Sequence, residues 1–405
     1  MHTTDTAAPT RLFFLDWLRI IAFFILILFH VGMYYVSWDW HVKSPAASHG
    51  PEPFMLLSSP WRLDLLFLVS GVASSFMLAR SKVTSFLRQR STRLLVPLLF
   101  GMLVVVPPQA YLEVVEKVSY GGSYLDFMHL YLTGYGGFCR GSDCLIMPTW
   151  NHLWFVAYLW LYTLGLAALV SILGERFDAL AGRVARSLSG WKIIVLPALV
   201  LAILRVLLAG RFPQNHAVIG DWYSHATYFS LFVLGALLAR APQVWPRLGD
   251  VRWVSLGISA ACWVAAVIFW AVPDDAVPAG QVEALRVLMR TVYALFAWCA
   301  IAAACGFAQR HLQRDGVARR YLTEAVFPVY IAHQTLIVVM AHALKPLRLA
   351  PGLEAMLLVV ATLTASFGIF EAVRRSALLR PLFGLASLRP QADGASTRLA
   401  AARAA

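Results

Sequence analysis

The sequence predicts an all-α, polytopic integral membrane protein with about ten transmembrane helices and both termini in the cytoplasm. The 405-residue chain is 60% hydrophobic and only 14% charged, with a mean hydropathy of +0.67, whereas soluble domains carry about 25% charged residues. Apolar runs of roughly 17–25 residues, long enough to cross a bilayer as a helix, recur along the chain. Most of the 34 lysines and arginines fall in alternate loops, and the positive-inside rule places those loops in the cytoplasm.

The apolar runs define the elements of this fold in order. The first run is too long for a signal peptide and lacks a small-residue cleavage site. We expect a transmembrane domain at residues 1–380 and a mobile cytoplasmic tail at 381–405. The net charge of +13 is then mostly topological, so the expected partner is the lipid bilayer and no nucleic acid is needed. The predicted spans cover residues 13–35, 60–79, 93–112, 150–173, 191–209, 222–239, 253–272, 285–308, 323–344 and 353–373.

The longest predicted outer loop, residues 113–149, is rich in glycine and contains Cys139 and Cys144. Disulfides persist outside the cytoplasm, so a bond between these two cysteines would form a local clip in the loop. Two unpaired thiols fit the sequence equally well, and both alternatives remain open.

Three ionisable residues fall within the first span: Asp16, Arg19 and His30. Such a group near the bilayer centre costs at least about 2.5–3.5 kcal/mol, so it marks a functional candidate. At about 100° per residue, Arg19 and His30 lie about 20° apart around the helix, and Asp16 lies about 40° from His30. All three therefore face the bundle interior or a wet cavity, with Arg19 roughly 16 Å closer to the cytoplasm than His30. The alternative is an Asp16–Arg19 pair that fixes helix packing, with His30 hydrogen-bonded in the core.

The second span begins at the outer face with Arg62 and Asp64. Asp64 lies at the predicted depth of His30, so we expect it to orient that imidazole or to pair with Arg62. Further along, Ser70 and Gly71 would let a thin ligand approach the backbone closely. Ordinary helix packing explains these two small residues equally well.

Arg88, Arg90 and Arg93 form a basic cluster at the cytoplasmic start of the third span. Arg90 and Arg93 are three residues apart, so they share one face of the helix. Because arginine binds phosphate oxygens bidentately, this fork predicts a phosphate site. A positive-inside anchor, or contact with anionic lipid headgroups, is the alternative.

Polar residues recur in three later spans. His152 opens the fourth span beside Trp154, where it is also explained as an interfacial belt residue. Arg205 lies in the outer third of the fifth span, and His333 lies deeper, in the ninth. No two histidines are three or four residues apart within one span, so we expect no metal site.

The ordered set of motifs resembles the acyltransferase 3 superfamily of membrane acyltransferases. Arg19 and His30 match its Arg/Lys-X10-His signature, and the run from Asp64 to Gly71 is similar to its D-x-F-F-x-x-S-G-F motif, although Leu66 and Val72 replace two aromatic residues. The resemblance runs over roughly residues 12–385 and is strongest to the glucans biosynthesis protein C branch. The segments that carry the likeness to this branch are FFLDWLR in the first span, WDWHVKS at 38–44, NHLWFVAYL at 151–159 and YLTEAVFPVYIAHQ at 321–334. Residues 90–93 resemble the R-x-x-R segment of the whole superfamily.

This resemblance implies O-acyl transfer across the bacterial inner membrane, from cytoplasmic acyl-CoA to hydroxyls of an exported glycan. In the nearest branch the acyl group would be succinyl and the acceptor a periplasmic glucan. Acyl-CoA, with succinyl-CoA favoured, is then a co-substrate and no cofactor is tightly bound. The basic cluster at Arg88, Arg90 and Arg93 would hold the CoA phosphates, and the pantetheine arm would pass Ser70 and Gly71.

The same resemblance implies roles for the other candidate residues. His30 would be the general base that takes the proton of the acceptor hydroxyl. Asp64 would fix its tautomer, and Asp16 and Arg19 would stabilise the channel or a donor phosphate. Arg205 would pair with an anionic acyl tail such as succinyl. The expected substrate contacts are Trp61, Arg62, His152, Trp154 and His333.

Three alternatives stay open. Asp16, Arg19 and His30 would equally suit the proton relay of a secondary transporter. A scaffold for a glycan-synthesis complex would leave those charges without a purpose. An acyltransferase that uses acetyl-CoA on another exported polysaccharide fits the same residues. The sequence does not decide whether the acyl group is transferred directly or through an acyl-enzyme intermediate. It also leaves open whether the chain forms a homo-oligomer or binds glycan-synthesis partners.

Overall fold

The computed structural model describes residues 12–273 and 276–387, and helices dominate those two ranges. A two-stranded hairpin, β1 (Cys139–Arg140) and β2 (Asp143–Cys144), accompanies them. The helices are α1 (Phe13–Tyr35), α2 (Glu52–Ser58), α3 (Arg62–Leu78), α4 (Val83–Phe100), α5 (Pro107–Val118), α6 (Tyr124–Leu132), α7 (Trp154–Leu173), α8 (Glu175–Ser187), α9 (Lys192–Leu208), α10 (Trp222–Leu238), α11 (Val244–Ala271), α12 (Val282–His311), α13 (Val317–Leu344), α14 (Pro351–Arg375) and α15 (Leu379–Leu382).

The predicted helical membrane fold is confirmed at the level of its class. Within the described residues, seven helical segments are long and apolar enough to cross a membrane, or up to nine if two bent pairs count as one span each. The bends measure 43° before α5 and 113° between α8 and α9. The count of ten and the cytoplasmic termini stay predictions.

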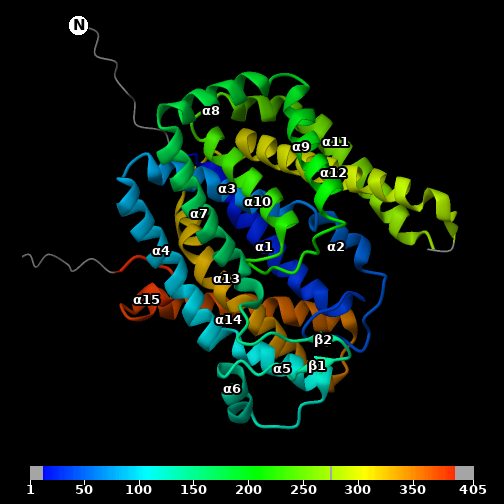
Figure 1. The fold of residues 1–405 in the computed structure, drawn as a ribbon. Helices are drawn as coiled ribbons and strands as arrows, with labels where there is room; N and C mark the ends of the chain where they lie inside the picture. Colours follow the sequence, from blue (N-terminus) through cyan, green and yellow to red (C-terminus); the bar gives the residue numbers. More distant parts are fainter. Residues whose placement is uncertain (1–11, 274–275, 388–405) are drawn as a thin grey trace, which may run out of the picture.

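Helices α1 and α13 pack side by side (Figure 1), and their paired residues show that they run in the same direction. Two pairs fix their register: Asp16 contacts Arg319 near the start of both helices, and His30 contacts His333 14 residues further along each. We call the end of the bundle at Asp16 the basic end, because Arg19, Arg90, Arg93 and Arg319 gather there.

Helices α3 and α10 approach at backbone contact. A Cβ atom on Gly71 would lie 1.9 Å from the carbonyl oxygen of Phe232, and one on Gly235 would lie 2.0 Å from that of Leu68. Only glycine fits at such a crossing. The prediction that Gly71 lines a ligand channel is therefore wrong, because this residue packs against the backbone of α10.

The end of the bundle opposite the basic end is covered, and we call it the capped end. The predicted loop at 113–149 contains regular structure, because α5 continues to Val118 and α6 and the β1–β2 hairpin follow it. Their aromatic side chains form a core of their own around Phe127, Tyr131 and Phe138. Cys139 and Cys144 are disulfide-bonded across the hairpin, which decides between the two alternatives left open by the sequence.

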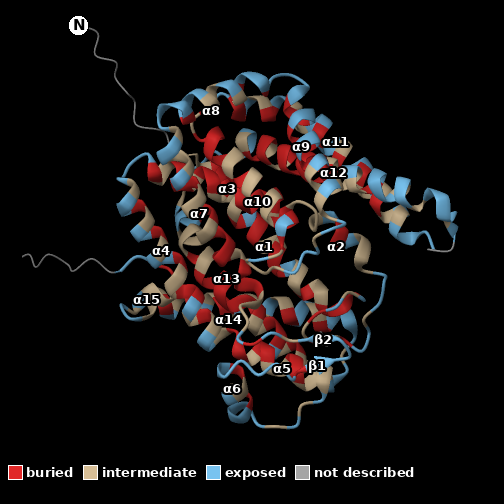
Figure 2. Cartoon of the chain, viewed as in Figure 1, coloured by how far each residue is buried: buried red, intermediate tan, exposed pale blue. Residues whose placement is uncertain are grey.

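Burial follows the membrane pattern. Buried residues concentrate on the inward faces of the helices, and exposed residues on their outer faces (Figure 2). Many of the exposed side chains are large and apolar, such as Leu28, Leu103 and Ile203, which suits contact with lipid. The start of the predicted tail packs against the bundle through Phe383 and Leu385. The rest of that tail, 388–405, lies outside the described residues.

Candidate functional site

A cavity of about 840 Å³ runs through the interior, along α1 from the basic end to the capped end. Arg19, Arg90 and Arg93 line one end of it, and Trp38 and His41 line the other. His30 and Ser70 line the stretch between them. The cavity therefore brings the arginine fork and the first-span histidine, which the sequence analysis predicted separately, into one continuous space.

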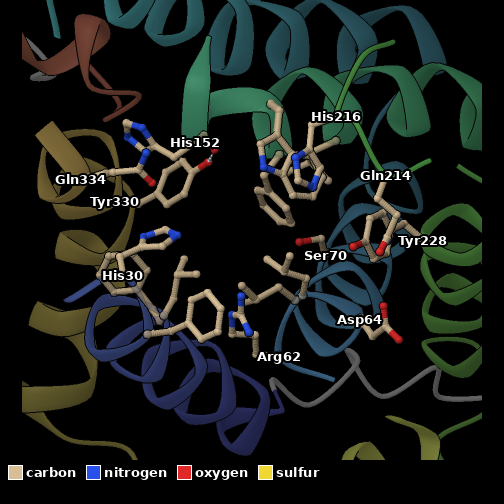
Figure 3. A pocket seen from close by; sticks show the side chains of 18 of the residues that line it. His30, Arg62, Asp64, Ser70, His152, Gln214, His216, Tyr228, Tyr330 and Gln334 are labelled. Carbon is tan, nitrogen blue, oxygen red and sulfur yellow. Dashed lines mark hydrogen bonds between the residues drawn. The ribbon is translucent and has the colours of Figure 1, made fainter. Parts of the chain in front are cut away.

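His30 and His333 form a hydrogen-bonded pair at this cavity, with 2.8 Å between Nδ1 of His30 and Nε2 of His333. Nδ1 of His333 lies 2.6 Å from the carbonyl oxygen of Tyr330. A carbonyl can only accept, so the proton of neutral His333 is on Nδ1 and its Nε2 accepts from His30. His30 therefore carries its proton on Nδ1, which leaves the Nε2 lone pair free to act as a base. The His30 ring lies at the edge of the open cavity (Figure 3).

The prediction that Asp64 orients His30 is therefore wrong. In Figure 3 the Asp64 carboxylate points away from the His30 ring. Asp64 is buried beside the charges of Arg205 and Arg62. It lines the cavity together with Arg205, which donates to the Tyr223 hydroxyl at 2.7 Å, and we call the part lined by Asp64, Arg205 and Tyr223 the side lobe.

Arg62 is buried, with 6% of its surface exposed, and it also lines the cavity. The centre of its guanidinium lies 3.3 Å from the centroid of the Phe29 ring, a cation–π contact. Its Nε and Nη1 atoms have no hydrogen-bond partner in the described part of the chain. Because these two atoms are themselves buried, the charge of Arg62 is uncompensated, and an anion in the adjoining cavity would balance it.

His152 is a structural neighbour of the histidine pair. Its Nε2 lies 3.1 Å from the Ile331 carbonyl, and Tyr330 donates its hydroxyl to the His152 carbonyl. The His152 and His333 rings meet edge to face with centroids 5.3 Å apart. These contacts join the short turn before α7 to α13, so His152 supports the wall of the cavity beside His333.

A polar network that the sequence analysis missed lines the capped end. His41 contacts Glu113 through Nδ1 and Gln334 through Nε2, the latter at 2.8 Å. Glu113 also pairs with Lys117 at 2.9 Å, and Lys117 reaches Asp39 at 2.8 Å. The signal was present in the Trp38–His41 run just after the first span, but the partners come from α5 and α13, which no local pattern connects to it.

Of the predicted basic cluster, the fork of Arg90 and Arg93 lies at the cavity and Arg88 does not, while phosphate binding stays a prediction. Arg90 is buried and donates to the Ser74 hydroxyl at 3.4 Å, and Arg93 donates to the Gly384 carbonyl at 3.1 Å. Both line the main cavity. Arg88 is exposed and lines neither described cavity, because it lies on the opposite face of α4.

A second cavity of about 300 Å³ at the basic end shares Arg19 and Arg93 with the first. Arg319, Arg320 and Arg380 also line it, although the positive-inside pattern accounts for loop and tail arginines only as determinants of orientation. Asp16 contacts Arg319 and lies 3.9 Å from Arg19. Asp16 therefore holds the basic end together and does not face the His30 pair.

The two tryptophans expected to contact substrate, Trp61 and Trp154, differ in whether they line the cavity. Trp154 lines the cavity and stacks on His216 with ring centroids 4.2 Å apart. His216 lies in the loop before α10, where burial lowers its pKa below the ordinary value of 6.5, so it stacks as a neutral ring at pH 7. Trp61 points away from the cavity, donates to the Leu57 carbonyl at 2.8 Å and packs toward α11. The expected substrate contact of Trp61 is therefore wrong.

A family model described as "Acyltransferase domain" matches residues 12–371. The chain belongs to this acyltransferase family. Curated relatives of this acyltransferase include glucans biosynthesis protein C from Salmonella schwarzengrund (strain CVM19633), Salmonella typhi and Salmonella typhimurium, each 26% identical over 161 residues. The match covers 40% of this chain and only 39% of the length of those relatives. No solved structure matches the chain significantly.

The acyltransferase site thus differs in part from the one expected. Of the expected site residues, those that line the cavity are His30, Arg19, Arg90, Arg93, Ser70, Arg62, Asp64, Arg205, His152 and Trp154, and their roles stay predictions. His333 is a direct partner of His30 rather than an outer contact. Within the described ranges, no group of three or more histidine, cysteine or acidic side chains is placed to hold a metal ion.

Proposed function

We propose that this acyltransferase moves an acyl group from cytoplasmic acyl-CoA to a hydroxyl of an exported glycan on the far side of the bacterial inner membrane, with succinyl as the group and a periplasmic glucan as the acceptor. One observation carries the proposal: a single cavity joins an arginine-lined end to a histidine whose Nε2 is free. The names of the Salmonella relatives support the glucan acceptor.

The direction of the helices supports the ten-span topology. Because α1 and α13 run parallel, an odd number of spans must separate them. Length and composition supply six between them, counting each bent pair once. Adding α10, an apolar helix of 17 residues, makes seven between the two helices and ten in all. The disulfide at the capped end suits the periplasm, and the arginines at the basic end suit the cytoplasm.

The donor enters at the basic end in this proposal. CoA carries several phosphates, and arginine forks bind phosphate with bidentate, charge-assisted hydrogen bonds. Arg93 and Arg19 line both the basic-end cavity and the main cavity. Phosphates held there leave the pantetheine arm to extend past Ser70 and place the thioester near His30.

The transfer follows from the tautomer of His30. Nε2 takes the proton of the acceptor hydroxyl while its oxygen attacks the thioester carbonyl carbon, and the carbonyl π electrons move onto oxygen. The tetrahedral intermediate re-forms the carbonyl and expels the CoA thiolate, which takes the proton from Nε2. His333 accepts the hydrogen bond from Nδ1 throughout, so the ring stays oriented. The products are an ester and free CoA.

The acceptor and the acyl tail occupy the other parts of the cavity. Trp38 and Trp154 line it at the capped end and offer flat faces for sugar rings. Arg205 lies in the side lobe with an unpartnered Nε among the described residues, so it suits the terminal carboxylate of succinyl. The proton-relay alternative has less support, since Asp16 is engaged by Arg319.

The test uses the purified full-length chain in proteoliposomes, with succinyl-CoA or acetyl-CoA on one side and a periplasmic glucan on the other. Mass spectrometry of the glucan reports the acyl group and the acceptor together. We expect a succinyl mass shift with the unaltered chain and none with His30→Ala, while His342→Ala, a histidine outside the cavity, keeps full activity. No acyl transfer from either donor by the unaltered chain would overturn the proposal.

A further inference from the structure

Arg62 presents a problem that the proposed function leaves unsolved. A buried charge is normally paired, because taking it out of water costs several kcal/mol. In the described part of the chain no ion pair reaches Arg62, and its Nε and Nη1 donors have no partner. Asp64, two positions along α3, is close enough to influence it electrostatically but does not form an ion pair with it.

The position of Arg62 is fixed by Phe29. The guanidinium lies on the Phe29 ring at 3.3 Å, and Phe29 directly precedes His30 on α1. This contact places the cation in the same stretch of the cavity as the His30 ring, and Figure 3 shows both side chains at that space. A positive charge next to a base does not help the base bind a proton, so the arrangement needs another purpose.

We propose that Arg62 donates hydrogen bonds to the carbonyl oxygen of the acyl group and stabilises the negative charge that develops there during transfer. This inference rests on the proposed function. When the acceptor oxygen attacks, the carbonyl π electrons move onto the acyl oxygen, and the Arg62 donors receive that charge. When the carbonyl re-forms, the charge leaves with the CoA thiolate and is neutralised by the proton from His30. Arg62 gains and loses no proton.

Fixed donors aimed at a developing oxyanion act strongly in a water-poor site, because they need no rearrangement during the reaction. Arg62 meets this description better than Arg205. Arg205 already donates to Tyr223, whereas Arg62 has two donors without a partner among the described residues and lies on the ring of Phe29, the residue next to the base. The two arginines then contact different parts of the acyl group: Arg62 lies at the reacting carbonyl and Arg205 at the terminal carboxylate.

The test compares Arg62→Gln and Arg62→Lys in the proteoliposome assay with succinyl-CoA and with acetyl-CoA. We expect Arg62→Gln to lower kcat on the order of 10²–10³-fold with both donors, with less than a threefold change in donor KM. Arg62→Lys keeps the charge and should recover part of the loss. Binding of a thioether analogue of succinyl-CoA, which cannot react, should stay unchanged in both variants and shows that they are folded.

Three results would overturn the assignment of Arg62 while leaving the proposed function intact. They are an unchanged kcat in Arg62→Gln, a loss confined to succinyl-CoA, and a loss that appears wholly in binding of the thioether analogue. A loss confined to succinyl would instead make Arg62 the carboxylate partner. Failure of the proposed function is distinct, because the unaltered chain would then transfer no acyl group.

Discussion

His30 on α1 and His333 on α13 are 303 positions apart in the chain, yet their rings are nearly parallel, with centroids 5.1 Å apart and a 2.8 Å hydrogen bond between them. The carbonyl of Tyr330 ends this chain of donors and acceptors. Because each donor in this row of hydrogen bonds has an acceptor, the backbone of α13 determines the proton positions of both rings. The position of the Tyr330 carbonyl therefore determines that Nε2 is the unprotonated nitrogen of His30.

Replacing His333 should therefore damage catalysis without damaging donor binding. We expect His333→Leu to lower kcat on the order of 10²–10⁴-fold, the range typical of general-base catalysis, because His30 loses its acceptor and its orientation. His333→Gln, whose side-chain oxygen can accept from His30, should recover part of the rate. Steady-state kinetics with His342→Ala as control checks this, and an unchanged kcat in His333→Leu would remove His333 from the mechanism.

The two cavity-lining arginines of α4 should act on donor affinity. We expect Arg90→Gln with Arg93→Gln to raise the donor KM on the order of 10–100-fold, because charge-assisted hydrogen bonds to phosphate contribute about 1.5–3 kcal/mol. The matched control is Arg88→Gln, which removes an exposed arginine of the same helix that lines neither cavity. Equal effects in the two variants would assign all three residues to orientation in the membrane.

The α3–α10 crossing should not tolerate a methyl group at Gly71. Gly71→Ala places Cβ 1.9 Å from a backbone oxygen, so the helices must separate, and overpacking typically costs about 1–3 kcal/mol. Gly257→Ala is the control, since its Cβ meets nothing within 4 Å and alanine favours a helix by about 1 kcal/mol. Thermal unfolding in detergent should show opposite shifts for the two variants. A stable Gly71→Ala would mean that the crossing is looser than described.

The disulfide offers a test of orientation. After reduction in intact cells, Cys139 and Cys144 should react with a maleimide that cannot cross the inner membrane. Cys262, Cys299 and Cys305 are buried and should stay unlabelled in the folded chain. An Arg88→Cys variant should react only after the membrane is opened. Labelling of Arg88→Cys from outside in intact cells would reverse the proposed topology.

Asp315, in the turn before α13, should give a measurable pH dependence. Hydrogen bonds from Arg320 and Arg319 hold its pKa below the ordinary value of 3.8. A carboxylate with a lowered pKa in the folded state stabilises the fold above its unfolded pKa, and this contribution is lost as the pH falls through the folded value. We expect Asp315→Asn to lower the thermal stability at pH 7 and the difference to shrink below about pH 4. A difference that does not vary with pH would contradict this role.

The sequence predicted the helices well because a bilayer imposes a simple rule on composition, which is that a span must be apolar for about 20 residues. The same rule identified His30 and Arg205, since polar groups in such segments are conspicuous. Boundaries were less accurate where helices extend beyond the apolar region, as α11 and α12 do. The helical cap at the capped end was missed because its packing is aromatic and local rather than membrane-determined.

The site was predicted only as far as single helices allow. Helical periodicity correctly placed Arg19 and His30 on a face that lines the cavity. It could not show that the partner of His30 is His333 rather than Asp64, because that choice depends on the neighbouring helix. Arg319 was counted as a loop charge, although it is buried with 2% exposed and pairs with Asp16. Each of these contacts joins residues about 300 positions apart, which no local pattern reports.

The parallel register of α1 and α13 makes their lengths interdependent. Fourteen residues, or about 21 Å, separate Asp16 from His30 on one helix and Arg319 from His333 on the other. One residue inserted in either helix between its two contacts would turn the second contact by about 100°, so the ion pair would survive while the imidazoles separated. The segments between the two contacts must therefore have equal length, and an insertion or deletion in one helix must be accompanied by the same change in the other.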